Sequence, residues 1–320
     1  MSQLLDQKTD GGTSEASGNG RNLVRNAADM TTLSPRLVAY NLGYLALVWA
    51  MALGAIALFW AYPAWYTFAL AFLVVSSRQQ ALLNCEHECV HRKFLPSRRW
   101  NELVGRYLCA APVGSPFAAA QARHLSHHRL LGTAEDPDRE LHAGDDQRTR
   151  RGLARHFVSG LLGGYAGMVL LGPPAIHAPL PKGTARPDLV SIIVIQVVIA
   201  AALTLAFAWW VYPALWLAPL ATLTALCHLV RSFVEHAITD DETAGHGNRL
   251  ITIHSNPIER GLLSPYFMNY HAEHHLVPSV PAPRLRELQE RLANDHDVPP
   301  VLERSSYGGA IRHYVRDLPD

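Results

Sequence analysis

Two long stretches of this chain contain no charged side chain. No Asp, Glu, Lys or Arg occurs within residues 37–77 or within residues 189–230. Each stretch is about forty residues long, and a membrane-spanning helix needs roughly twenty apolar residues. A proline near the middle of each stretch, Pro63 or Pro213, breaks the helix there. The pattern therefore predicts two helical hairpins, with spans over approximately 37–61, 64–83, 189–210 and 213–232.

Aromatic and basic residues orient these hairpins. Trp60, Trp209 and Trp210 lie just before the two turns, and Trp favours the membrane interface. The turns carry no charge, whereas the other ends of the hairpins are basic, and positive charge collects on the cytoplasmic side. We therefore expect both termini to be cytoplasmic. The basic residues are Arg21, Arg25, Arg36, Arg78, Arg92, Lys93, Arg98, Arg99, Lys182, Arg186 and Arg231.

The rest of the chain divides around this membrane part. Residues 1–35 are rich in Gly, Ser, Asp and Asn and predict a disordered tail. A membrane domain is expected over 36–290 and a C-terminal cytoplasmic tail over 291–320. The apolar segments 107–122 and 157–180 are broken by Gly and Pro, so we interpret them as interfacial or re-entrant rather than spanning.

Composition alone hides this organisation. The 320 residues are 49% hydrophobic and 17% charged, with a net charge of +1 and a mean hydropathy of +0.03, values that a soluble protein also shows. The four cysteines are too dispersed for a disulfide framework, and we expect them to be reduced. We expect no nucleic-acid partner. The predicted fold class is an all-α integral membrane protein with a cytoplasmic helical domain.

Three tight clusters hold eight of the seventeen histidines. They occur in the sequences HECVH, HLSHH and HAEHH. Residues three or four apart share one face of a helix, so each cluster presents its imidazoles in one direction. Imidazole is the commonest metal ligand, and eight ligands are too many for one tetrahedral ion, so two ions are expected. The eight residues are His87, His91, His124, His127, His128, His271, His274 and His275.

Two other interpretations of the clusters remain open at this point. HECVH also fits the HExxH signature of zinc proteases, in which Glu88 would activate water, but that mechanism leaves six further histidines without a role. A single histidine pair is usually a hydrogen-bonded feature of a helix face. Three clusters on the same predicted side of the membrane favour a metal site instead.

The order H-x-x-x-H, H-x-x-H-H, H-x-x-H-H around two membrane hairpins resembles the membrane fatty acid desaturase superfamily. The resemblance covers roughly residues 35–290 and includes the phrases HLSHHRLLGTAEDPD, RSFVEHA and IHSNPIERGLLSPYFMNYHAEHHLVPSVP. It implies that the eight clustered histidines bind two iron ions. It also implies one further histidine ligand, for which His236 is preferred over His228 and His254.

Several other residues lie close enough in sequence to support the ligands. Metal-bound imidazoles usually donate their second ring proton to a carboxylate or carbonyl. Asp136 and Asp138 could equally be turn residues. The candidates for this supporting role are Glu86, Glu88, Asp136, Asp138, Glu235, His254, Asn269 and Glu273.

The resemblance implies an oxygen-dependent di-iron desaturase acting on a fatty acyl chain carried by CoA, acyl carrier protein or lipid. A hydroxylase or ketolase of an acyl chain or terpenoid is the alternative. Either reaction takes two electrons from outside, so a ferredoxin, rubredoxin or cytochrome is expected as partner. The basic segments 92–99 and 148–155 are candidate docking sites for an acidic carrier.

Overall fold

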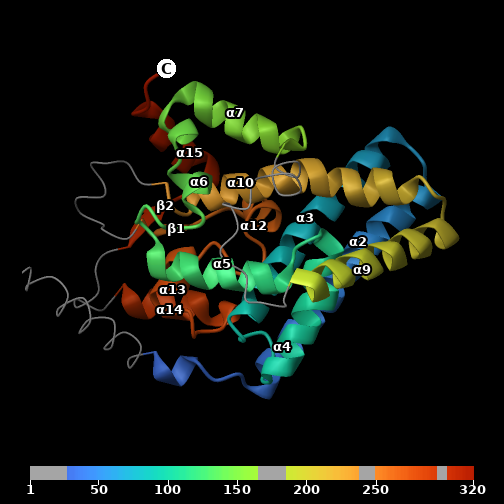
Figure 1. Cartoon of the computed structure of the whole chain (residues 1–320), viewed down its shortest axis with the longest axis horizontal. Coiled ribbons are helices and arrows are strands. Elements are labelled where there is room, and N and C mark those ends of the chain that lie inside the picture. Colours follow the sequence, from blue (N-terminus) through green and yellow to red (C-terminus); the bar gives the residue numbers. More distant parts are fainter. Residues whose placement is uncertain (1–26, 165–184, 238–248, 294–300) are drawn as a thin grey trace, which may run out of the picture.

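The structure is a computed structural model, and it describes residues 27–164, 185–237, 249–293 and 301–320. Most of these residues are helical. The long helices run toward one end of the molecule, and the shorter helices gather at the other end (Figure 1). The long elements are α2 (Pro35–Ala61), α3 (Trp65–Val90), α9 (Ala185–Ala206) and a continuous helical run formed by η6 (Pro213–Leu217), η7 (Leu220–Thr224) and α10 (Ala225–Val234).

The shorter elements follow the order of the chain. They are η1 (Ala28–Met30), α4 (Arg98–Val104), η2 (Gly105–Ala110), η3 (Ala111–Val113), α5 (Phe117–Leu130), α6 (Arg139–His142), η4 (Asp145–Arg148), α7 (Arg150–Leu161), β1 (Ile251–Ile253), α12 (Pro257–Leu262), α13 (His271–Leu276), η8 (Ala282–Arg284), α14 (Leu285–Leu292), β2 (Leu302–Arg304) and α15 (Tyr307–Arg316).

The first predicted hairpin consists of α2 and α3. The Ser34 hydroxyl caps α2 by accepting a hydrogen bond from the Leu37 amide at 3.3 Å, and Pro35 occupies the first turn. Pro63 follows the helix end, as predicted. The hydroxyl of Thr67 then accepts from the Ala64 amide at 3.0 Å and starts α3.

α3 differs from its prediction because it continues seven residues beyond the expected end at residue 83. Its second half carries Gln79, Gln80, Asn84 and Glu86, all buried within the protein rather than facing lipid. The Gln79 amide donates to the Trp216 carbonyl at 2.8 Å, which satisfies one of these buried groups. The second half of α3 therefore places polar side chains at the centre of the helix bundle.

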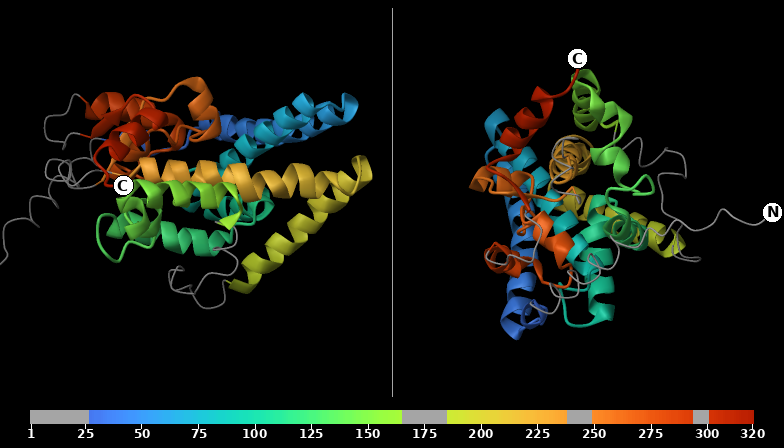
Figure 2. Two further views of the ribbon diagram at one scale, coloured as in Figure 1. Left: turned by 90° about the horizontal axis from the view of Figure 1, so that it is seen from above. Right: turned by 90° about the vertical axis from the view of Figure 1, so that its left-hand side faces the viewer.

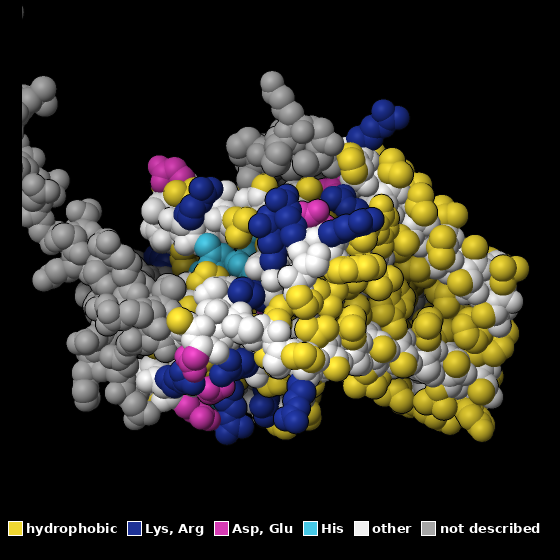
Figure 3. Space-filling view, turned by 90° about the horizontal axis from the view of Figure 1, so that it is seen from below, with side chains coloured by type: hydrophobic (Ala, Val, Ile, Leu, Met, Phe, Trp, Pro, Cys, Tyr) yellow, Lys and Arg dark blue, Asp and Glu magenta, His cyan; other side chains and the backbone are white. Residues whose placement is uncertain are grey.

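Among the described residues, three helices are long and apolar enough to cross a membrane. They are Pro35–Ala61, Arg186–Ala206 and Pro213–Val234, with mean hydropathies of 2.1, 2.7 and 1.6. Side chains on these helices leave a broad apolar surface over one half of the molecule, and Lys and Arg gather at its border (Figure 3). α9 ends at Ala206, four residues before the predicted boundary, and the chain turns through residues 207–210.

The second hairpin is open at the end away from its turn (Figure 2). The η2–η3 segment, predicted as re-entrant or interfacial, lies in this opening and packs against α9 and α3. Gln196 on α9 donates to the carbonyls of Ala111 and Pro112, both at 2.9 Å. The indole of Trp216 also donates to the Pro112 carbonyl, at 3.0 Å. These bonds satisfy backbone groups that the broken helix leaves unpaired.

Two predicted tails contain structured residues. η1, within the segment predicted as disordered, buries Met30 in the core, whereas residues 1–26 lie outside the described residues. In the predicted C-terminal tail, β2 pairs in parallel with β1, and α15 packs on α10. The all-α prediction missed this small sheet, in which β1 is a short run of β-branched residues. Residues 165–180 of the second apolar segment also lie outside the described residues.

Candidate metal centre

Four elements from distant parts of the sequence bring the histidines together. His87 lies in the last turn of α3 and His91 directly follows that helix, while α5 carries the second cluster and α13 the third. His236 lies directly after α10, within the turn that ends the second hairpin. All nine histidines predicted as ligands therefore lie at the same end of the two hairpins (Figure 1).

The nine imidazoles form two groups, and within each group the candidate ligand atoms all lie within 4.8 Å of one another. In group one, the Nε2 atom of His124 is 2.8 Å from that of His91 and 2.8 Å from that of His128. In group two, the Nε2 atoms of His127 and His236 are 3.2 Å apart. Group one is His87, His91, His124, His128 and His274, and group two is His127, His236, His271 and His275.

A cation fits these groups better than hydrogen bonds between imidazoles do. The Nε2 atom of His124 faces two other Nε2 atoms, and a single ring proton can satisfy only one of these contacts. Both ring nitrogens of His87 are buried without a hydrogen-bond partner among the described residues. A positive ion at the centre of each group would accept all these lone pairs, which removes the cost of leaving them unpaired.

The electrostatics favour the protonation state that ligation needs. Burial lowers the pKa of His91 to about 4, and burial together with nearby imidazoles lowers the pKa of His274 well below its usual value. The pKa values of His124, His236, His271 and His275 are also lowered, in each case chiefly by burial. These rings are therefore neutral at neutral pH and have lone pairs available for a metal.

Asp136 connects the centre to a further histidine. Its carboxylate accepts hydrogen bonds from His127 Nδ1 at 2.8 Å and from His142 Nε2 at 3.0 Å. Although burial raises the pKa of Asp136, these two hydrogen bonds hold it below its usual range. His236 donates from Nδ1 to the Arg249 carbonyl at 3.0 Å. Both interactions leave the Nε2 atom of the ligand histidine pointing into group two.

His142 is a residue that the sequence analysis missed. Its side chain is buried, and its ring centroid lies 5.1 Å from that of His236. It belongs to none of the three sequence clusters, and its spacing from them follows no helical repeat. In the sequence, the one indication of its role was the nearby candidate Asp136, whose carboxylate accepts a hydrogen bond from His142.

Two other predicted supporting residues reach the ligands. A carboxylate oxygen of Glu235 lies 3.5 Å from His271 Nε2, and Arg231 donates to the same carboxylate at 2.8 Å. Asp138 lies 3.9 Å from His127 Nδ1 and pairs with Arg123. Each of these acids therefore lies beside group two together with an arginine partner.

The remaining predicted supporting residues form contacts elsewhere. Glu88 accepts from the Ala282 amide at 3.0 Å, so its carboxylate is not directed at the histidine pair as a zinc protease would require. Glu273 accepts from the Thr252 hydroxyl, and Asn269 donates to the Ile253 carbonyl. His254 is exposed and pairs with Glu303 at 2.9 Å. Glu86 accepts from the Ser115 hydroxyl at 2.7 Å.

A cavity of about 600 Å³ lies against both histidine groups. Its lining includes His87 and His124 of group one and His127, His236 and His271 of group two, together with His142 and His228. Its other walls are largely apolar and include residues on four elements, η3, η6, η7 and α10: Val113, Leu217, Leu220, Ala221 and Ala225. The cavity thus joins the candidate metal centre to the interior of the second hairpin.

Comparisons with known proteins agree with this site. The sequence model of a family described as "Fatty acid desaturase" matches residues 63–301. The chain is 24% identical to a dihydrorhizobitoxine desaturase of Bradyrhizobium elkanii, over 77% of this chain and 72% of that protein. It is 25% identical to a β-carotene ketolase of Paracoccus sp. (strain N81106 / MBIC 01143), over 67% of this chain and 76% of that protein. A ketolase of Paracoccus sp. (strain PC1) is 26% identical over 62% of this chain and 69% of its own length.

Proposed function

The chain belongs to the fatty acid desaturase family, and on this basis we propose that it is an oxygen-dependent di-iron desaturase that introduces a double bond into a fatty acyl chain. One observation carries the proposal: nine imidazoles form two adjacent groups that share the wall of one largely apolar cavity. Such an arrangement places a substrate carbon beside two metal ions.

Histidine-only ligand sets accept several transition metals, and family membership favours iron. Group one would hold one ion and group two the other. When bound, the iron pair supplies the oxidising power, drawn from O₂, that removes hydrogen from an unactivated C–H bond. The protein's own residues keep the imidazoles neutral and fix their orientation through the hydrogen bonds of Asp136 and Arg249.

We propose that the protein is integral to the membrane, with four spans and with the metal centre and both termini on the cytoplasmic side. Three apolar helices and the basic border of the apolar surface support this topology. The cavity lining includes Leu217 and Leu220 of the last candidate span, so an acyl chain can be held within the hairpin and away from water. CoA, acyl carrier protein or an intact lipid is the proposed carrier of the chain.

The reaction also needs electrons from a second protein. Removal of two hydrogens from a –CH₂–CH₂– unit consumes one O₂, two electrons and two protons, and it releases two molecules of water. We propose that a ferredoxin, rubredoxin or cytochrome supplies the electrons one at a time.

A second function, oxygen insertion as a ketolase or hydroxylase, is favoured by the similarity to two β-carotene ketolases. The same metal centre can serve either reaction, because the outcome depends on which carbon the cavity holds beside it. A carotenoid or other terpenoid would then replace the acyl chain.

Expression in two hosts tests both functions. One host has a defined fatty acid composition, and the other produces β-carotene. Mass spectrometry of lipids should show new double bonds in the first host and no oxidised carotenoid in the second. A new keto or hydroxyl product without new unsaturation would replace desaturation by the second function. An unchanged profile in both hosts, from a chain that holds about two irons, would refute both substrate classes.

A further inference from the structure

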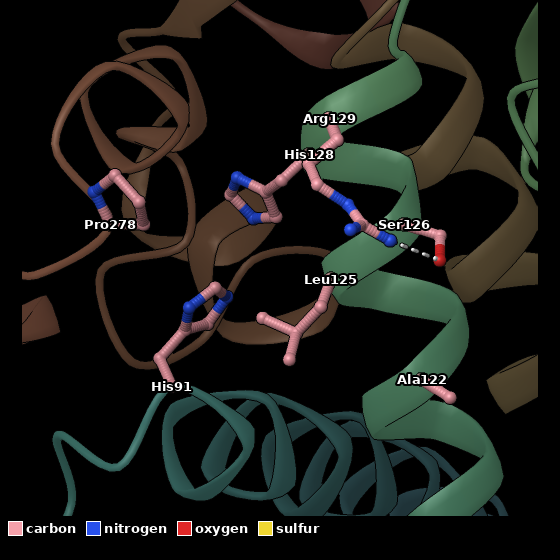
Figure 4. A pocket seen from close by; sticks show the side chains of 7 residues that line it. All are labelled: His91, Ala122, Leu125, Ser126, His128, Arg129 and Pro278. Atoms are coloured by element: carbon pink, nitrogen blue, oxygen red, sulfur yellow. Dashed lines mark hydrogen bonds between the residues drawn. The ribbon is translucent and has the colours of Figure 1, made fainter. Parts of the chain in front are cut away.

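Group one also faces a second hollow, of about 650 Å³, which opens at the protein surface. His91 and His128 line it, with Leu125 and Arg129 on α5 and Pro278 opposite (Figure 4). The exposed side chain of Leu125 points toward His91 (Figure 4). Histidine side chains are visible at the surface between Lys and Arg side chains (Figure 3).

α5 separates this hollow from the cavity that lies against both histidine groups. Ala122, Leu125 and Arg129 line the hollow, whereas Ala120 and His127 line the cavity. The two spaces share no lining residue, and residues three or four apart on a helix share a face. A molecule in the hollow can therefore reach His91 and His128 without entering the space where substrate would bind.

The histidines at the hollow have unused hydrogen-bonding capacity. Metal-bound imidazoles usually donate their second ring proton to the protein, as His127 does to Asp136. Among the described residues, no hydrogen bond joins the Nδ1 atom of His91 or of His128 to a protein acceptor, and the contacts of both rings run through Nε2. An acceptor on a second molecule can complete these hydrogen bonds. One hydrogen bond and two bonds of the imidazole ring would then connect that acceptor to the Nε2 atom, the candidate ligand nitrogen.

The charge around the hollow is positive. Arg129 is exposed at its rim, Arg92 is exposed directly after His91, and none of the lining residues is acidic. α4, which begins with the exposed Arg98 and Arg99, lies on the same side of the molecule, whereas α7 lies on the opposite side (Figure 1). A negatively charged surface is therefore attracted to this face.

We propose that this hollow is the docking surface of a small, acidic one-electron carrier protein, which reduces the metal centre through His91 and His128. The inference rests on the proposed function. In each encounter the carrier is oxidised by one electron and the metal centre is reduced by one, so two encounters supply the electrons for one turnover. The hollow is a better candidate than the basic segment 148–155. That segment lies on and just before α7, which is on the opposite side of the molecule (Figure 1).

Binding of a plant-type [2Fe–2S] ferredoxin to the full chain in lipid nanodiscs tests the proposal without requiring activity. Arg129→Glu should weaken binding about tenfold at low salt and reduce its salt dependence, while Arg129→Lys should bind as the unchanged chain does. Arg151→Glu on α7, also an exposed arginine, is the matched control and should bind normally. An equal or larger loss with Arg151→Glu, or no salt-sensitive binding to the unchanged chain, would overturn the proposal.

The rate of reduction separates docking from the metal chemistry. In the iron-loaded chain, reduced ferredoxin should reduce Arg129→Glu about tenfold more slowly than the unchanged chain, whereas dithionite should reduce both at the same rate. Equal ferredoxin rates would overturn the role of the hollow. If the chain holds no iron, the proposed function fails, and the binding titration still decides whether the ferredoxin docks here.

Discussion

The two hairpins differ in how their helices pack. In the first, α2 and α3 remain together along their length, and small or branched side chains such as Ala52, Ile56, Ala71 and Val75 are buried in a core that also includes residues of the second hairpin. The second hairpin is closed only near its turn, where Ile199 on α9 shares a core with residues of the helical run that begins at Pro213. Beyond that point its helices diverge and enclose η2 and η3.

This difference gives each hairpin a separate role. The closed hairpin delivers His87 and His91 to group one, and the end of the open hairpin delivers His236 to group two. α5 and α13 contribute to both groups. The opening of the second hairpin also provides the space for the cavity that lies against both histidine groups, whose walls include Val113 on η3 and Leu217 on η6. The first hairpin therefore supplies candidate ligands alone, and the second also encloses the cavity in which we propose that substrate binds.

The largest effect is expected from removing a ligand of either group. His274→Ala in group one and His236→Ala in group two should each abolish turnover, because the proposed reaction needs both metal ions. Iron analysis of the purified variants should show a fall from about two irons per chain to about one or fewer. The spans should still insert, since neither residue lies within them.

His313→Ala provides a control, because this histidine lies on α15 and outside both groups. It should retain iron and activity. If His236→Ala kept full activity and two irons, the assignment of the second hairpin to group two would be wrong.

A large effect on stability is expected where the start of α9, at the open end of the second hairpin, contacts η2 and α5. Asp188 on α9 is buried, pairs with Arg106 and accepts from the Ala118 amide at 2.9 Å at the start of α5. Asp188→Ala leaves Arg106 without this partner and should lower the free energy of unfolding by about 3 kcal/mol. Thermal and denaturant unfolding in detergent can measure the loss.

Glu102→Ala removes an exposed ion pair with Arg98 on α4 and is the matched control. It should change the free energy of unfolding by about 1 kcal/mol or less. Equal losses of unfolding free energy in the two variants would show that Asp188 does not stabilise the open end of the second hairpin.

A smaller effect is expected from the contact that orients His127. Asp136→Asn keeps the size of the side chain but weakens its hydrogen bonds to His127 and His142. Such supporting contacts typically contribute about 10–100-fold to metal affinity or activity. Iron affinity and turnover should fall within that range, while Glu135→Gln at an exposed neighbouring position should change neither. Unchanged iron affinity in Asp136→Asn would mean that His127 is held by other contacts.

The helices were predictable because their signals are local. The charge-free stretches and the two prolines located α2, α9 and the run Pro213–Val234 to within a few residues. The far end of α3 was not predictable in this way. Its polar half is buried by other helices rather than by lipid, and hydropathy cannot distinguish these two environments. Small segments such as β1, which depend on pairing with a distant strand, also left too weak a pattern.

The convergence of the histidine clusters was predictable for a similar reason, since hairpin topology alone brings the ends of α3 and α10 to one side. The partners of the acids were not predictable. Glu88 and Glu273 lie within the clusters yet bond to Ala282 and Thr252, whose proximity depends on how loops fold over the site. His142 joins Asp136 for the same kind of reason. Sequence spacing can identify which residues share a helix face, but not which loop covers it.

The smallest effect concerns the space within the open hairpin. Ala221 lines the cavity that lies against both histidine groups, and Ala221→Leu adds three carbons to its wall without a change in charge. If substrate lies there, kcat/KM for the preferred substrate should fall by about tenfold, and shorter chains should be affected less than longer ones. Ala57→Leu adds the same volume on the exposed side of α2 and should leave the preference unchanged. A shift in chain-length preference with Ala57→Leu and none with Ala221→Leu would place the substrate against the first hairpin, and the two hairpins would then exchange the roles assigned to them here.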